Sequence, residues 1–141
     1  MQRRKLCTTT QVTASGGREG HGRSDDGVLD MPMSIPAKMG GPGREASNPE
    51  QLFAAGYSAC FENAVLHVTK QEGVEIEASS VTARVDLGVN DDGSFGLKVD
   101  MKVSLQGVKR ERAGPLIQEA GRLCPYSNAV RGSVPDNIEL A

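Results

Sequence analysis

The chain has 141 residues, a length typical of one domain. Hydrophobic residues make up 38% of it, and 17 glycines bring the apolar share to about half, which excludes wholesale disorder. The 16 basic and 18 acidic side chains give a net charge of -2, so the chain lacks the basic excess that binding to nucleic acid requires.

No apolar segment is long enough to span a bilayer. The longest nearly apolar run covers residues 52–61, whereas a membrane helix needs about 18 or more. The basic first residues lead into a threonine-rich segment rather than the apolar stretch of a signal peptide. We therefore expect a cytoplasmic protein. In that reducing compartment three cysteines without a Cys-x-x-Cys pair predict redox or catalytic chemistry, with neither a metal nor a cofactor.

The first third of the chain predicts two strands and a long loop. Residues 6–13 are rich in threonine and valine and predict a strand that ends at Gly16 and Gly17. A glycine-rich stretch over residues 20–27 leads to a second predicted strand at 28–31. Residues 34–47 contain two prolines and several glycines, so we expect a long connection without regular structure.

A helix is predicted over residues 50–71. Ser47 or Asn48 can cap it, Pro49 suits its first position, and Glu50 follows Ser47 at capping-box spacing. Gly73 provides the stop. Because the first half is apolar nearly all round, we expect a central, buried helix.

The remainder predicts a hairpin, a second helix and a terminal strand. Residues 80–87 and 95–105 alternate apolar and polar side chains on either side of turn-forming residues 90–93, which indicates an antiparallel hairpin. A second helix should cover about residues 110–123, with Pro115 tolerated only near its start. Ile138 and Leu140 suggest a short strand. This order of elements predicts an α+β fold.

Two of the three cysteines stand in settings that favour chemistry. Cys60 lies in the middle of the first predicted helix, where a small buried core residue is the alternative. Cys124 ends the second helix, and Pro125 should expose that last turn; helix-terminal packing is the alternative. A Cys-His hydrolase pairing Cys60 with His67 is disfavoured, because two helical turns separate them by about 10 Å.

Two charged residues could serve such a thiol. Arg18 is flanked by glycines that would let the backbone deliver it into a pocket, although a solvated loop arginine is the alternative. Glu50 can satisfy the helix N-terminus and can also hold a guanidinium in bidentate geometry. The two roles of Glu50 are compatible.

Three segments together, residues 16–18, 47–61 and 123–129, resemble the organic hydroperoxide resistance proteins of the Ohr/OsmC family. The resemblance implies one thiol peroxidase domain over residues 1–141 that serves in the oxidative stress response. It also implies an α+β fold in which curved antiparallel sheets wrap two central helices of an intertwined homodimer. By motif, Cys60 matches the peroxide-attacking cysteine, Cys124 the resolving cysteine, and Arg18 with Glu50 the activating ion pair. Cys7 matches no functional position.

The implied reaction reduces an organic hydroperoxide, such as that of a fatty acid, to an alcohol. Only the thiolate attacks effectively, so Cys60 needs a cation, which Arg18 supplies while Glu50 positions it. Cys60 becomes a sulfenic acid and condenses with Cys124 to a disulfide. The resemblance suggests a lipoylated protein as the dithiol reductant. Candidate apolar residues for the substrate pocket are Met31, Met33, Ile35, Phe53 and Phe61.

The sequence also predicts that two chains share each site. Glu50 and Cys60 are ten residues apart, or about 15 Å along one helix. A two-fold axis near residue 55, among the small residues Ala54, Ala55 and Gly56, would set Glu50 of one chain opposite Cys60 of the other.

The competing interpretation of the protein's function is a redox sensor or a hydroperoxide-binding protein that does not turn over.

Overall fold

The computed structural model describes residues 4–141, which divide after Pro49 into two compact units. The first unit ends at Pro49 and the second extends from Glu50 to Ala141.

The first unit contains a small antiparallel sheet in the order β1-β2-β3, formed by β1 (Val12–Ser15), β2 (His21–Ser24) and β3 (Asp30–Pro32). The predicted strand at residues 6–13 is wrong in its bounds, because pairing begins only at Val12, opposite Ser24. β2 lies within the glycine-rich stretch over residues 20–27, for which no strand was predicted. Gly22 is buried in this strand between Ala14 and Met31, and a Cβ added there would meet only the Met33 side chain, at 3.4 Å.

A 3₁₀ turn, η1 (Gly17–Glu19), joins β1 to β2. Gly16 and Gly17 have φ of 80° and 56°, a left-handed backbone that favours glycine. A Cβ added at Gly20 would lie 1.7 Å from the carbonyl oxygen of Ser15. The glycines around Arg18 are therefore required by the turn itself. The connection after β3, predicted to be irregular over residues 34–47, contains only the short 3₁₀ turn η2 (Ala37–Met39) as a helical element.

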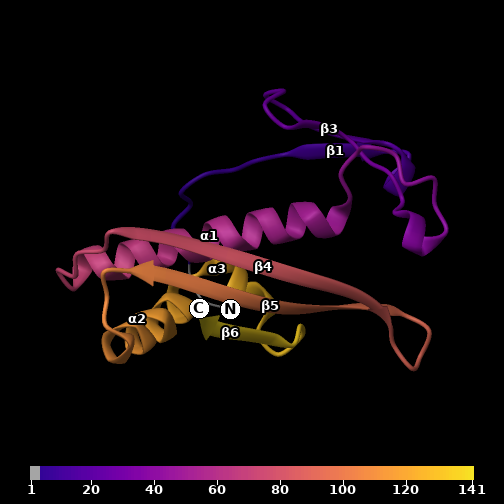
Figure 1. Ribbon diagram of the computed structural model, residues 1–141. Helices are drawn as coiled ribbons and strands as arrows, with labels where there is room; N and C mark the ends of the chain where they lie inside the picture. The colour runs from indigo at the N-terminus through magenta and orange to yellow at the C-terminus, as the bar shows by residue number, and fades with distance from the viewer. Residues whose placement is uncertain (1–3) are drawn as a thin grey trace. The chain divides into compact units, whose positions relative to one another are not determined.

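The second unit contains the elements α1 (Pro49–Gln71), β4 (Ala78–Val89), β5 (Phe95–Gln106), α2 (Arg110–Leu123), α3 (Pro125–Val130) and β6 (Asp136–Leu140), with α1 beginning at the boundary residue (Figure 1). The predicted helices, hairpin and terminal strand are confirmed. Gly73 follows α1 with φ of 66°, as its stop predicts. Pro115 is the sixth residue of α2 and lies in its second turn.

The sheet of the second unit has the order β4-β5-β6. β4 and β5 pair antiparallel over twelve residues each, whereas β6 pairs parallel to β5, a departure from the expected antiparallel sheets. On β5, Val99, Met101 and Val103 are buried, and the residues between them face the other side of the sheet. The core thus lies on one face of this sheet, where its side chains join those of α1 and α2 in one cluster.

The first half of α1 is less buried than its apolar sequence predicts. Its fully buried residues begin at Tyr57 and continue along one face, whereas Ala55 and Ala59 are exposed. The second unit therefore covers only one side of this half of the helix. In residues 4–141, no helix combines the length and the apolar character needed to cross a membrane.

Candidate active site

The sulfur atoms of Cys60 and Cys124 lie 3.7 Å apart. Cys60 lies in the middle of α1, and Cys124 joins α2 to α3. Cys60 is partly exposed, but Cys124 is 0% exposed, so the expected exposure of the helix end is wrong. The reason is that Pro125 starts α3 at once and turns the chain back onto α1, which encloses Cys124. The two thiols are close enough to be joined after small side-chain rotations.

Backbone N–H groups from the first turn of α3 approach both sulfurs. The amide of Ser127 donates to Cys124 Sγ at 3.5 Å, which makes Cys124 the N-cap of this short helix. The amide of Tyr126 interacts with the Cys60 thiol and favours its thiolate. α3 therefore contributes to the surroundings of both cysteines, a role that the sequence analysis missed.

The surroundings of Cys60 within this chain raise the pKa of its thiol. Burial is the largest cause, and the neighbouring Cys124 raises the pKa further, while the hydrogen bond from the Tyr126 amide lowers it. A raised pKa means that less thiolate is present at neutral pH. A reactive thiolate at Cys60 would consequently need a nearby cation.

A buried tyrosine ties α1 to α3 and to β6. The hydroxyl of Tyr57 is 2.9 Å from Ser127 Oγ and donates to Asp136 Oδ2 at 3.3 Å. Tyr57 is 0% exposed, and burial, the largest cause, raises the pKa of its phenol, so it stays protonated at neutral pH. Since the phenol has a single proton, the Ser127 hydroxyl donates to Tyr57. Sequence reasoning missed this network, because only the fold brings Asp136 to α1.

Gly56 allows α3 to approach α1. A Cβ at this position would lie 2.8 Å from Tyr126 Oη and 3.1 Å from its ring. The sequence analysis assigned Gly56 to contact with a partner helix, but within the chain its absent side chain already makes room for Tyr126. This close approach places Tyr126 and its neighbours Cys124 and Ser127 against the helix that bears Cys60.

A pocket of about 300 Å³ opens beside Cys60. We call it the Cys60 pocket, and its lining residues are Cys60, Asn63, Ala64, His67, Leu123 and Pro125. The four from α1 have the spacing of a single helix face. His67, which the sequence analysis set aside as a proton acceptor for Cys60, thus lines the same pocket as the thiol. Cys124 does not line it.

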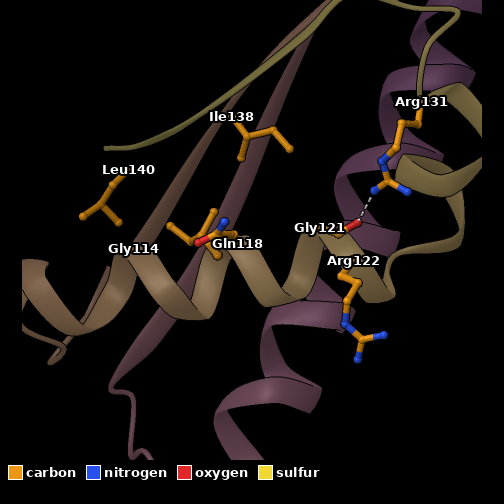
Figure 2. A pocket seen from close by; sticks show the side chains of 8 residues that line it. Gly114, Gln118, Gly121, Arg122, Arg131, Ile138 and Leu140 are labelled. Carbon is orange, nitrogen blue, oxygen red and sulfur yellow. Dashed lines mark hydrogen bonds between the residues drawn. The ribbon is translucent and has the colours of Figure 1, made fainter.

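A larger groove of about 500 Å³ lies between α2 and β6 (Figure 2). Apolar side chains from both elements, including Ile117, Ile138 and Leu140, line it, and neither cysteine does. Arg131 at one end donates to the Gly121 carbonyl oxygen at 2.9 Å, and Arg122 pairs with Glu119. Both arginines therefore already have partners within the chain. The groove does not include either thiol.

The two charged candidates come from different units. Arg18 lies in η1, and the adjacent Glu19 anchors this turn by accepting from the backbone N–H of Ile35 and pairing with Arg44 at 3.1 Å. Glu50 lies in the first turn of α1. Because α1 is continuous, Glu50 is about 15 Å from Cys60 of its own chain. The structure of one chain therefore brings Cys60 and Cys124 together but keeps Glu50 apart from Cys60.

The apolar candidates have unequal exposure. Phe61 is 0% exposed and belongs to the core cluster of the second unit, and Met33 is 8% exposed. Phe53 packs partly buried against the core and the ring of Tyr57. Among residues 4–141, no group of three or more His, Cys, Asp or Glu side chains could hold a metal ion.

The second unit is thus an α+β fold in which a sheet packs against helices that carry two neighbouring thiols. Residues 41–139 match the family described as OsmC-like protein. The chain is 46% identical to organic hydroperoxide resistance protein OhrB of Bacillus subtilis, over 94% of this chain and 96% of that protein. It is 39% identical to the organic hydroperoxide resistance protein of Xanthomonas axonopodis pv. citri, over 97% and 96%.

Solved structures of organic hydroperoxide resistance proteins have the same fold as this chain. The organic hydroperoxide resistance protein from Elizabethkingia anophelis superposes with a TM-score of 0.94 at 42% identity, covering 98% of this chain and 99% of that one. One from Vibrio cholerae, with captopril bound in one of its active sites, gives 0.93 at 41% identity, covering 99% and 95%. The chain belongs to the OsmC-like family, within its organic hydroperoxide resistance branch.

Proposed function

We propose that this protein detoxifies organic hydroperoxides as a thiol-dependent peroxidase. Its relatives are named for organic hydroperoxide resistance, which supports the detoxifying role. The observation that carries the mechanism is the pair of sulfurs 3.7 Å apart, one partly exposed and one buried. An exposed thiol can meet the peroxide, and a buried neighbour can trap the oxidised sulfur.

The reaction balances with the two cysteines and one dithiol. The Cys60 thiolate attacks the peroxide, the O–O bond breaks, and the alkoxide takes a proton and leaves as an alcohol. Cys60 is then a sulfenic acid, which condenses with the Cys124 thiol, releasing water and forming a disulfide. A dithiol, for which we propose a dihydrolipoyl group, is oxidised to its disulfide and restores both cysteine thiols. No step requires a bound cofactor or metal, and the cytoplasm keeps such thiols reduced.

Arg18 and Glu50 would activate the thiol. The pKa of Cys60, raised by burial and by Cys124, calls for a cation. A guanidinium stays charged and can donate hydrogen bonds to the peroxide oxygens while the O–O bond breaks. A carboxylate beside the sulfur would raise the pKa of the thiol further, so the role of Glu50 is to position Arg18. Both units then act as one catalytic domain.

The distance along α1 favours a homodimer with shared sites. Glu50 lies about 15 Å from Cys60 of its own chain. An antiparallel crossing of two α1 helices near residue 55 would set Glu50 of one chain opposite Cys60 of the other. The exposed Ala55 and Ala59 are small residues on the uncovered side of α1, which suits a close helix contact.

Cysteine variants test the mechanism. We expect Cys60→Ser to abolish hydroperoxide consumption. Cys124→Ser should permit one attack and then accumulate sulfinic and sulfonic acid at Cys60, because nothing traps the sulfenic acid. Mass spectrometry of peroxide-treated protein distinguishes these products. Unchanged steady-state consumption in Cys60→Ser would refute the mechanism.

A further inference from the structure

The Cys60 pocket gives solvent access to one of the two sulfurs. Cys60 lines the pocket, whereas Cys124 is 0% exposed and does not line it. After oxidation the reductant must attack one of these sulfurs. The difference in exposure determines which one a thiol arriving from solvent can reach.

We propose that the dithiol reductant enters the Cys60 pocket and that its thiolate attacks Cys60 Sγ, with Cys124 as the leaving group. This inference rests on the proposed function and adds to it the point of entry and the sulfur attacked. The Cys60–Cys124 bond breaks as a bond forms between Cys60 and the reductant, and the electron pair leaves on Cys124, which takes a proton. The second thiolate of the reductant then attacks its own bound sulfur. The reductant then leaves as a cyclic disulfide, and Cys60 is released as a thiolate.

The direction of attack fits the buried position of Cys124. Thiol–disulfide exchange requires the entering sulfur to approach in line with the bond that breaks, opposite the leaving sulfur. Cys124 is 0% exposed whereas Cys60 is partly exposed, so a thiol that arrives from solvent meets the Cys60 sulfur with Cys124 as the far sulfur of the bond.

The Cys124 sulfur has a hydrogen-bond donor beside it. The Ser127 amide donates to Cys124 Sγ at 3.5 Å, and Ser127 is itself held by the buried Tyr57 hydroxyl at 2.9 Å. A sulfur that leaves with the electron pair keeps this donor, which supports Cys124 as the leaving group.

The shape and lining of the pocket suit a slender dithiol. Its volume of about 300 Å³ is at the low end for small-molecule sites. Ala64, Leu123 and Pro125 supply apolar walls, and Asn63 and His67 supply polar groups. An alkyl dithiol is small enough to enter a space of this volume.

Trapping with a monothiol tests which sulfur is attacked. Protein carrying Cys7→Ser, which removes the exposed third thiol, is oxidised with one equivalent of tert-butyl hydroperoxide and mixed briefly with 2-mercaptoethanol. Acid quenching, blocking with N-ethylmaleimide and trypsin digestion separate Cys60, in the 45–70 peptide, from Cys124, in the 123–131 peptide. We expect 2-mercaptoethanol on the first peptide and N-ethylmaleimide on the second. The reverse would overturn the proposal, whereas failure to form the disulfide at all would refute the proposed function instead.

A bulky substitution tests the point of entry. Asn63→Trp should narrow the Cys60 pocket, and Gln71→Trp is the matched control, since Gln71 is exposed on the same helix and does not line the pocket. We expect dihydrolipoamide to reduce the oxidised Asn63→Trp protein about tenfold more slowly than the control, equivalent to about 1.4 kcal/mol of barrier. Equal rates would overturn entry through this pocket.

Discussion

The hydroxyl of Tyr57 in α1 lies 2.9 Å from the hydroxyl of Ser127 in α3, seventy positions later in the chain. The Ser127 amide donates in turn to Cys124 Sγ, and Tyr57 lies one helical turn before Cys60. A single buried phenol thus links the element that carries one cysteine to the element that encloses the other.

Removing this hydroxyl should destabilise the protein. Tyr57→Phe leaves the buried Ser127 hydroxyl without its partner and removes the bond to Asp136, so we expect a loss of about 1–3 kcal/mol in the free energy of unfolding. Urea denaturation measures it. The control is Tyr126→Phe, at a position 40% exposed, which should change stability by less than about 0.5 kcal/mol. Equal losses in the two variants would contradict the assigned role of Tyr57.

Arg18 should lower the pKa of Cys60. Burial and Cys124 raise that pKa within the chain, so Arg18→Ala should shift the rise of the iodoacetamide reaction to higher pH. Arg18→Lys should also be impaired, because an ammonium cannot reproduce bidentate pairing with Glu50. The rate is followed on the 45–70 peptide, in a Cys7→Ser background. A pH profile identical to that of the parent would show that Arg18 is not the activating cation.

The effect of Gly56→Ala on the free energy of unfolding should change sign with the residue at position 126. In the parent the new methyl group meets Tyr126 Oη at 2.8 Å, and such overpacking costs about 1–3 kcal/mol. In a Tyr126→Ala background the clash disappears, and alanine should stabilise α1 by up to about 1 kcal/mol through its higher helix propensity. Urea denaturation of the four proteins gives the coupling. A coupling of zero would contradict the contact.

Subunit mixing tests the shared site. Cys60→Ser and Glu50→Ala are each expected to be inactive, and a heterodimer of the two would contain one intact site and one doubly damaged site. Activity should therefore reappear when the variants exchange subunits. Persistent inactivity despite verified exchange would rule out a site built from two chains.

The sequence predicted the second unit well, because its signals are local. The alternation along β4 and β5, the turn between them and the glycine after α1 each specify structure within a few residues. β2 was missed because Gly22 reads as a loop residue, whereas its strand pairing depends on β1 and β3. The parallel pairing of β6 likewise depends on its contact with β5.

The sequence named candidate residues for the site but not their geometry. Motif resemblance singled out Cys60 and Cys124, yet the burial of Cys124 follows from the turn between α2 and α3. The bond between Tyr57 and Asp136 joins residues 79 positions apart, and no periodicity signals it. The raised pKa of Cys60 depends on burial, which only the packed structure defines.

Repeated turnover distinguishes a peroxidase from a thiol that is oxidised once. Substoichiometric protein is mixed with tert-butyl hydroperoxide and excess dihydrolipoamide, and hydroperoxide is followed over time. We expect consumption of many equivalents per Cys60, with the disulfide to Cys124 detected when the dithiol is limiting. Consumption that stops at one equivalent while reduced dithiol remains would contradict a peroxidase and indicate a thiol that is oxidised once, as in a sensor.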